Sequence, residues 1–160
     1  MIHINIICIG KLKEKYLQDA LCEYSKRLSK YCTLKITELV DEKLPSNLNY
    51  TLINQIKEKE CNNIISHIGK NSYVISLDLN GKQFTSEDFS KKITNISLNN
   101  SSNITFIIGG TLGLSQKVLD NSNELICFSK MTFPHQLIRI FLLEQLFRGF
   151  KISNNETYHR

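Results

Sequence analysis

Residues 128–139 read FSKMTFPHQLIR, and they join a short apolar segment to the most hydrophobic helix predicted in the chain. Pro134 has no backbone N–H and a fixed φ, so it suits the first turn of a helix. Ser129 and Thr132 carry hydroxyls just before that turn, where free helix N–H groups need acceptors. A loop of this kind, at the carboxyl end of a strand, is where open α/β sheets bind small ligands. On local chemistry alone, a well-capped connection with nothing bound fits the stretch equally well.

The remainder of the chain alternates predicted strands with predicted helices. Apolar runs and period-two patterns predict strands at 2–9, 33–40, 73–79, 104–110 and 124–129. Apolar residues at helical spacing predict helices at about 13–30, 50–68, 85–98, 115–121 and 134–149, and the tail after them shows no periodicity. Asn80-Gly81 is a turn signal. The alternation predicts a single α/β domain over residues 1–160, with a mainly parallel sheet and helices on both faces. General topology rules add that such a sheet should be unknotted.

Composition and charge limit the class of protein. Of the 160 residues, 41% are hydrophobic and 22% are charged, which is ordinary for a soluble globular protein, and no apolar run is long enough to span a bilayer. The opening MIHINIICIGK reads as a first strand and not as a signal peptide. The five cysteines include no C-x-x-C pair, which indicates free thiols in a reducing cytoplasm. The four histidines are far apart in sequence, so we expect no metal site.

The net charge of +5 permits an anionic partner such as RNA without requiring one. The first predicted helix concentrates positive charge on its polar face, at Lys13, Lys15, Lys26, Arg27 and Lys30. This face is either simply solvated or in contact with an RNA backbone.

Three loops follow the three most apolar strands, at 77–81, 109–114 and 128–134. In a parallel sheet these strand ends meet at one edge, so the loops are expected to line one pocket. The GGTLG sequence at 109–113 is neither a G-x-G-x-x-G motif nor a Walker motif, and no G-x-S-x-G elbow is present. Nicotinamide-dependent and hydrolase functions are therefore disfavoured.

The same loops carry a resemblance. The stretches SLDLNGK (76–82), FIIGGTLGL (106–114), FSKMTFPHQLIRIFLLEQLFRG (128–149) and YHR (158–160) resemble the RlmH family. These are SPOUT-class methyltransferases that modify N3 of a pseudouridine in the large ribosomal subunit. GKLKEKY (10–16) and EYSKRL (23–28) are also similar, so the match covers essentially the whole chain. The long C-terminal motif with its YHR ending is highly specific, and Gly149 is a departure, because the family usually has alanine there.

The resemblance implies an S-adenosylmethionine-dependent enzyme with a trefoil knot in its C-terminal half. It implies a homodimer with the active site at the subunit interface, acting on 23S rRNA within the assembled ribosome, with no DNA or membrane partner. A cytoplasmic location follows. Carried over residue by residue, the cofactor contacts fall on Leu77, Gly109, Phe128, Ser129, Lys130, Met131, Thr132 and Phe133.

Methyl transfer to an imide-like N3–H requires positioning, a proton acceptor and stabilisation of the developing anion. The candidate catalytic residues are His135, Arg139, Tyr158, His159 and Arg160. His135 lies near a helix N-terminus, which favours neutral imidazole, and it is either a proton acceptor or a brace for the cofactor loop. Nothing in the monomer obviously anchors the last three residues, so they are either a disordered tail or, as the family ending favours, part of the active site.

The last predicted helix is apolar on all sides, at Leu137, Ile138, Ile140, Phe141, Leu142, Leu143, Leu146 and Phe147. One apolar stripe would suffice to pack on the sheet, so a second stripe predicts a homodimer, unless the helix is fully buried in the monomer. Two other functions stay open: a different SPOUT enzyme acting on tRNA, and a non-catalytic ribosome-binding module.

Overall fold

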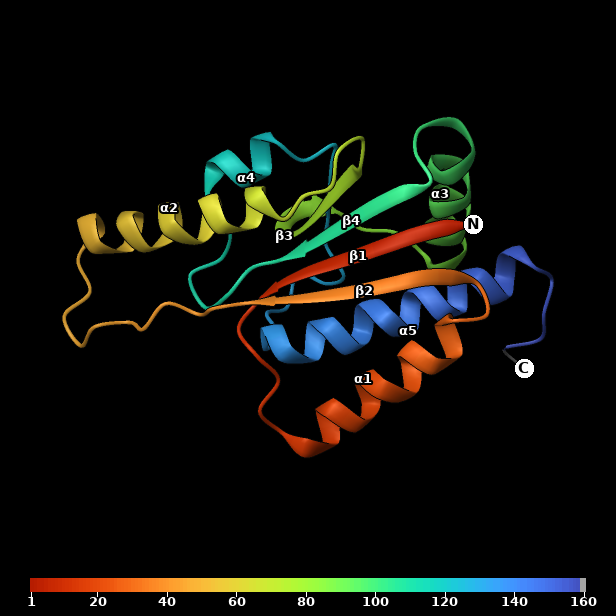
Figure 1. Ribbon diagram of the computed structural model, residues 1–160, viewed down its shortest axis with the longest axis horizontal. Helices are drawn as coiled ribbons and strands as arrows, with labels where there is room; N and C mark the ends of the chain where they lie inside the picture. Colours follow the sequence, from red (N-terminus) through yellow and green to blue (C-terminus); the bar gives the residue numbers. More distant parts are fainter. Residues whose placement is uncertain (159–160) are drawn as a thin grey trace.

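The computed structural model describes residues 1–158, in which five strands alternate with five helices (Figure 1). The strands are β1 (Ile2–Ile9), β2 (Cys32–Leu39), β3 (Tyr73–Lys82), β4 (Asn103–Ile108) and β5 (Glu124–Ile126). The helices are α1 (Lys15–Leu28), α2 (Tyr50–Ser66), α3 (Ser86–Asn99), α4 (Gln116–Asp120) and α5 (His135–Ser153). The sheet has the order β2-β1-β4-β3-β5, and each neighbouring pair is parallel. The predicted parallel α/β sheet is confirmed.

The two faces of the sheet are covered by different helices, as predicted. Side chains of β1 alternate, so that Ile4, Ile6 and Cys8 belong to one core cluster while Ile7 and Ile9 belong to the other. The first cluster is closed by α1, α3 and α5, and the second by α2 and α4.

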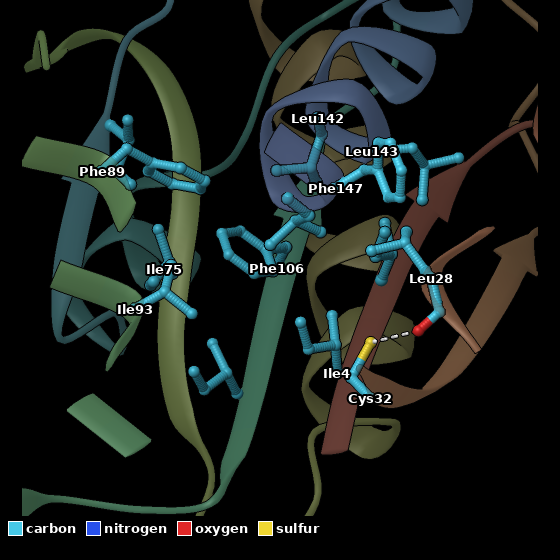
Figure 2. Close-up of a cluster of buried hydrophobic side chains, with 14 of the residues drawn as sticks. Ile4, Leu28, Cys32, Ile75, Phe89, Ile93, Phe106, Leu142, Leu143 and Phe147 are labelled. Carbon is cyan, nitrogen blue, oxygen red and sulfur yellow. Dashed lines mark hydrogen bonds between the residues drawn. The ribbon is translucent and has the colours of Figure 1, made fainter. Parts of the chain in front are cut away.

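The larger core lies under α3 and α5. Figure 2 shows Phe89 of α3 and Leu142 of α5 lying over Ile75 and Phe106 of the sheet, and both sheet residues are fully buried. Each such side chain contributes about 1.5–3 kcal/mol of transfer free energy on burial. None of the helices within residues 1–158 is long and apolar enough to cross a membrane.

Hydroxyl side chains cap the starts of α3 and α4, whereas the start of α5 departs from the capping expected there. Thr85 accepts from the backbone N–H of Asp88 at 3.1 Å, and Ser115 accepts from that of Val118 at 3.4 Å. The N-cap of α5 is Pro134, which makes no side-chain capping bond. The Ser129 hydroxyl instead accepts from the N–H of Met131 at 3.0 Å, so it orders the loop and does not cap the helix.

The turn predicted at Asn80-Gly81 is an excursion inside a longer strand. Leu77 and Lys82 of β3 both pair with Ile126 of β5, so residues 78–81 bulge out of the ladder. A Cβ on Gly81 would lie 2.5 Å from the carbonyl carbon of Ile126, so the return of the strand requires glycine here. Asn80-Gly81 predicts only a local turn, whereas the bulge depends on the pairing of β3 with β5, a strand more than forty residues later in the chain.

Helix α5 extends to Ser153, four residues beyond its predicted end. It packs on the sheet between α1 and α3, which buries Leu142, Leu143, Leu146 and Phe147 within one chain. Leu137, Ile138 and Ile140, nearer the start of the helix, are only partly buried. Phe141 remains 39% exposed. The packing within one chain therefore buries the second half of the apolar helix, and the first half keeps apolar surface that a partner could cover.

Candidate functional site

The three predicted loops line one cavity of about 300 Å³ at the carboxyl edge of the sheet. Its walls include seven of the eight residues expected to contact a cofactor: Leu77, Gly109, Phe128, Ser129, Met131, Thr132 and Phe133. Lys130 is exposed and does not line the cavity. We call this space the first cavity.

Glycines let the second loop fold tightly against the sheet. A Cβ on Gly109 would lie 3.0 Å from the carbonyl carbon of Gly113, and a Cβ on Gly110 would lie 2.9 Å from Cγ2 of Ile9. Gly113 has a φ of +72°, which disfavours other residues. These glycines are needed for the shape of the loop itself, before any ligand is considered.

The excursion in β3 supplies a further wall. Asp78, Leu79 and Asn80 line the first cavity, and the Asp78 carboxylate accepts from the N–H of Asn80 at 2.9 Å. Sequence reasoning did not select Asp78, although a charge inside an apolar strand was a visible signal. It also passed over Cys127, whose thiol donates to the carbonyl of Ser129 at 2.8 Å and so shapes the third loop.

His135 is half-buried and lines the first cavity from the first turn of α5. Burial lowers the pKa of its imidazole, and the positive charge of Arg139 adds to this, against an opposing effect from Asp41. The ring is thus neutral at neutral pH and can accept either a hydrogen bond or a proton.

Arg139 occupies a different position from the one expected of a residue in contact with a substrate. Its side chain is fully buried and does not line the first cavity. One terminal nitrogen donates to the carboxylate of Glu38 and the other to the carbonyl of Gly10 at 3.0 Å. Arg139 therefore ties the ends of β1 and β2 to α5, one turn after His135.

Tyr158 is anchored in the monomer, so that part of the sequence prediction is wrong. Its hydroxyl donates to Glu144 at 2.8 Å, its ring packs edge-on against Phe147 at 5.2 Å, and the Arg148 guanidinium lies 4.6 Å from the ring centre. These contacts already cover the ring of Tyr158, which disfavours stacking of this ring under a base of an RNA substrate. The candidates His159 and Arg160 lie outside the described residues.

A second cavity of about 290 Å³ adjoins the first. The two share residues 126–129 and Phe133, so the loop after β5 forms a common wall. The remaining lining combines three phenylalanines with four polar residues, and comprises Phe84, Thr85, Ser86, Phe89, Phe141, Glu144 and Gln145.

The basic face of α1 is partly neutralised by its own helix. Lys15 pairs with Asp19 at 2.5 Å, and Arg27 pairs with Glu23 at 2.8 Å. Contact of this face with RNA stays a prediction.

Comparison with known proteins identifies the family. A family model described as "Predicted SPOUT methyltransferase" matches residues 2–159. A protein of Clostridium tetani named "Ribosomal RNA large subunit methyltransferase H" is 57% identical over 158 residues, which cover 99% of both chains. A Clostridium perfringens protein named "Ribosomal RNA large subunit methyltransferase H 1" is 56% identical with the same coverage.

A solved structure agrees at the level of fold. It is titled "The structure of a probable methylase family protein from Haemophilus influenzae Rd KW20", and it superposes with a TM-score of 0.53 at 11% identity. The match covers 98% of this chain and 70% of that one. The family model and the full-length sequence matches show that the chain belongs to the SPOUT methyltransferase family.

Proposed function

We propose that this chain transfers a methyl group from S-adenosylmethionine to N3 of a pseudouridine in 23S rRNA, within the assembled ribosome. The observation that carries the proposal is full-length identity of 56–57% to proteins named for large-subunit rRNA methylation. A cavity at the edge of the sheet, lined by three strand-end loops, supports it.

The residues of the first cavity fit the proposed cofactor. S-adenosylmethionine supplies an electrophilic methyl group on a sulfonium, which needs no phosphate cradle. Leu77, Phe128, Met131 and Phe133 offer apolar walls, and the glycine loop at 109–113 lets backbone groups approach closely. A volume of about 300 Å³ is at the lower end of the range for ligand sites.

Proton removal from the acceptor nucleotide is assigned to a small set of groups. The neutral imidazole of His135 faces the first cavity and can accept a proton there. His159 and Arg160 are proposed to act at the acceptor base, where a cation would stabilise the anion formed at N3. Arg139 acts indirectly, because its guanidinium is committed to Glu38 and Gly10.

A homodimer is part of the proposal. Next to the shared loop, Phe141 is 39% exposed and Met131 is 73% exposed, and Phe133 packs on Phe141 at 5.5 Å. This apolar group adjoins both cavities, so a second copy covering it would bring two subunits together at the site. Light scattering at micromolar concentration tests it, and a monomer would count against it.

A trefoil knot is proposed for the C-terminal half. The chain leaves β3 for β4, returns past β3 to place β5 at the sheet edge, and then passes back under the sheet as α5. This path is compatible with threading through a loop. A high-resolution chain trace that can be pulled straight from both ends would refute it.

One assay tests the function. Purified protein is given S-adenosylmethionine and whole ribosomes, deproteinised 23S rRNA or tRNA, and methylated nucleosides are identified by mass spectrometry. We expect N3-methylpseudouridine from ribosomes and little product from deproteinised rRNA, with the reaction in the cytoplasm where ribosomes reside. Product on tRNA would favour a different SPOUT activity. Absence of both product and calorimetric cofactor binding would favour a non-catalytic module.

A further inference from the structure

The C-terminal tail reverses direction after α5. Asn155 has a φ of +55°, and the N–H groups of Asn155 and Glu156 donate to the carbonyls of Ile152 at 3.0 Å and Lys151 at 2.9 Å. A residue in this left-handed conformation is a common way to end a helix and turn the chain. The tail therefore returns along α5, towards the helix end that borders the first cavity (Figure 1).

An outer contact holds the returning chain at Glu156. Its carboxylate accepts from the hydroxyl of Tyr31 at 2.8 Å and from the ammonium of Lys151 at 2.5 Å. Both contacts are exposed to solvent, so they contribute little to stability. They do set the side of α5 on which the tail returns.

The inner contact is made by Glu144, whose side chain is 18% exposed. Its carboxylate accepts from the Tyr158 hydroxyl at 2.8 Å and from Nε of Arg148 at 3.0 Å. Burial alone would raise the pKa of Glu144, but hydrogen bonds from Tyr24, Tyr158 and Arg148 outweigh it and hold the pKa below its ordinary value. The carboxylate is therefore charged at neutral pH and remains an acceptor for Tyr158.

Glu144 also lines the second cavity, which shares the loop after β5 with the first. Tyr158 is consequently tied to a residue in the wall of a cavity beside the proposed cofactor site. Two further residues can extend a chain by at most about 7 Å. Whatever residues 159 and 160 reach is set by where Tyr158 is held.

We propose that Glu144 is a positioning residue for methyl transfer, because its hydrogen bond to Tyr158 fixes the point from which the last two residues reach the reacting groups. The inference rests on the proposed function and assigns a role within it. In this proposal Tyr158 anchors the tail, and the two residues that follow it reach the reacting groups.

A double-mutant cycle tests this role. Tyr158→Phe removes the hydroxyl and keeps the ring on Phe147 and beneath Arg148, so the fold is preserved. Glu144→Ala removes the acceptor, and Glu144→Gln restores a neutral one. Single-turnover methylation of ribosomes, the KM for ribosomes, cofactor affinity by calorimetry and hydrogen exchange of residues 154–160 are measured for each.

We expect Tyr158→Phe and Glu144→Ala each to lower the rate constant by about tenfold or more, with cofactor affinity within about twofold of wild type. The double variant should be no slower than Glu144→Ala alone, because that change already breaks the bond that Tyr158→Phe removes, together with the bonds from Tyr24 and Arg148. Glu144→Gln should recover part of the rate, and exchange in the tail should accelerate in Glu144→Ala. Glu42→Ala, which removes an ion pair with Lys59 beside α2, is the matched control and should match wild type.

Three outcomes overturn the proposal. If Tyr158→Phe methylates at the wild-type rate, the contact has no role in positioning. If the two effects multiply, the hydroxyl and the carboxylate act separately, as a directly catalytic Tyr158 would require. If wild-type protein fails to methylate ribosomes, both the proposed function and this role of Glu144 fail. If wild-type protein is active and the variants are unaffected, only the role of Glu144 fails.

Discussion

The guanidinium of Arg139 on α5 is joined to the carboxylate of Glu38 at the end of β2, 101 residues away in sequence. Arg139 is fully buried, whereas the Glu38 side chain is 31% exposed. Glu38 also accepts from the N–H of Leu12 at 3.1 Å, so one carboxylate holds both the loop after β1 and the start of α5. Removal of Glu38 therefore leaves a buried guanidinium, whereas removal of Arg139 leaves a partly exposed carboxylate.

We expect Glu38→Ala to destabilise the fold more than Arg139→Met. Loss of Glu38 leaves a buried charge without its counter-ion, which typically costs about 3–5 kcal/mol. Loss of Arg139 leaves a carboxylate that water can reach, so a cost of about half that size is expected. Urea unfolding measures both, and equal costs, or a larger cost for Arg139→Met, would contradict the asymmetry.

Thr132→Trp should block the first cavity without harming the fold. Thr132 is exposed and lines the cavity, so an indole there can fill the space from outside the core. Affinity for S-adenosylmethionine should fall by about tenfold or more, equivalent to about 1.4 kcal/mol, with the unfolding midpoint unchanged. Thr51→Trp, at an exposed position of α2, is the control. Unchanged calorimetric affinity in Thr132→Trp would mean that the cofactor binds elsewhere.

Gly109 is a poorer position for the same test, although it was selected from sequence. A Cβ there would press on Gly113 and Leu114 at 3.0–3.1 Å, so any substitution distorts the loop as well as the cavity. Lost binding in Gly109→Val would therefore not locate the ligand.

His135 should make stability depend on pH in the weakly acidic range. Burial lowers the pKa of its imidazole in the folded state, so between that value and the ordinary one of about 6.5 the unfolded chain binds more protons. Stability from this group is full above pH of about 6.5 and is lost as the pH falls. In His135→Gln the loss between pH of about 7.5 and 5.5 should be smaller than in wild type or in the exposed control His67→Gln. Parallel urea titrations at the two pH values decide this.

Gly149→Ala should stabilise the protein. Gly149 lies inside α5, where glycine costs about 0.8–1 kcal/mol relative to alanine. An added Cβ would meet Cα of Ser90 at 3.5 Å, an ordinary van der Waals contact, and the bond from the Ser90 hydroxyl to the Gly149 carbonyl would be kept. We expect a rise in Tm of about 2–4 °C by calorimetry. Gly69→Ala, outside the helices with open space around it, is the control, and a fall in Tm of Gly149→Ala would show that α3 and α5 are packed too tightly.

The features predicted correctly are those that local patterns determine. Period-two alternation identified the strand that became β1, and strand ends in a parallel sheet brought three loops to one cavity. The errors involve partners distant in sequence. The excursion before Gly81 depends on β5, and the burial of Arg139 depends on β2. No periodicity along the chain encodes either contact.

The contacts of Tyr158 were likewise not predicted from the sequence. They determine which truncation of the tail tests the active site. The sequence shows no anchor for residues 158–160, but Tyr158 packs on Phe147 and donates to Glu144, so its removal should destabilise the protein by about 1–2 kcal/mol. Removal of His159 and Arg160 alone spares these contacts. The shorter truncation should keep wild-type stability and cofactor affinity.

That shorter truncation should still slow methylation of ribosomes by about tenfold or more, a loss of about 1.4 kcal/mol in transition-state stabilisation. The physical reason is that a cation and an imidazole are removed from the acceptor base, while the point from which they extend is unchanged. Comparison of the two truncations by urea unfolding, calorimetry and single-turnover rate separates anchoring from chemistry. A chain ending at Tyr158 that methylates ribosomes at the wild-type rate would exclude His159 and Arg160 from the reaction and leave His135 as the proton acceptor to test.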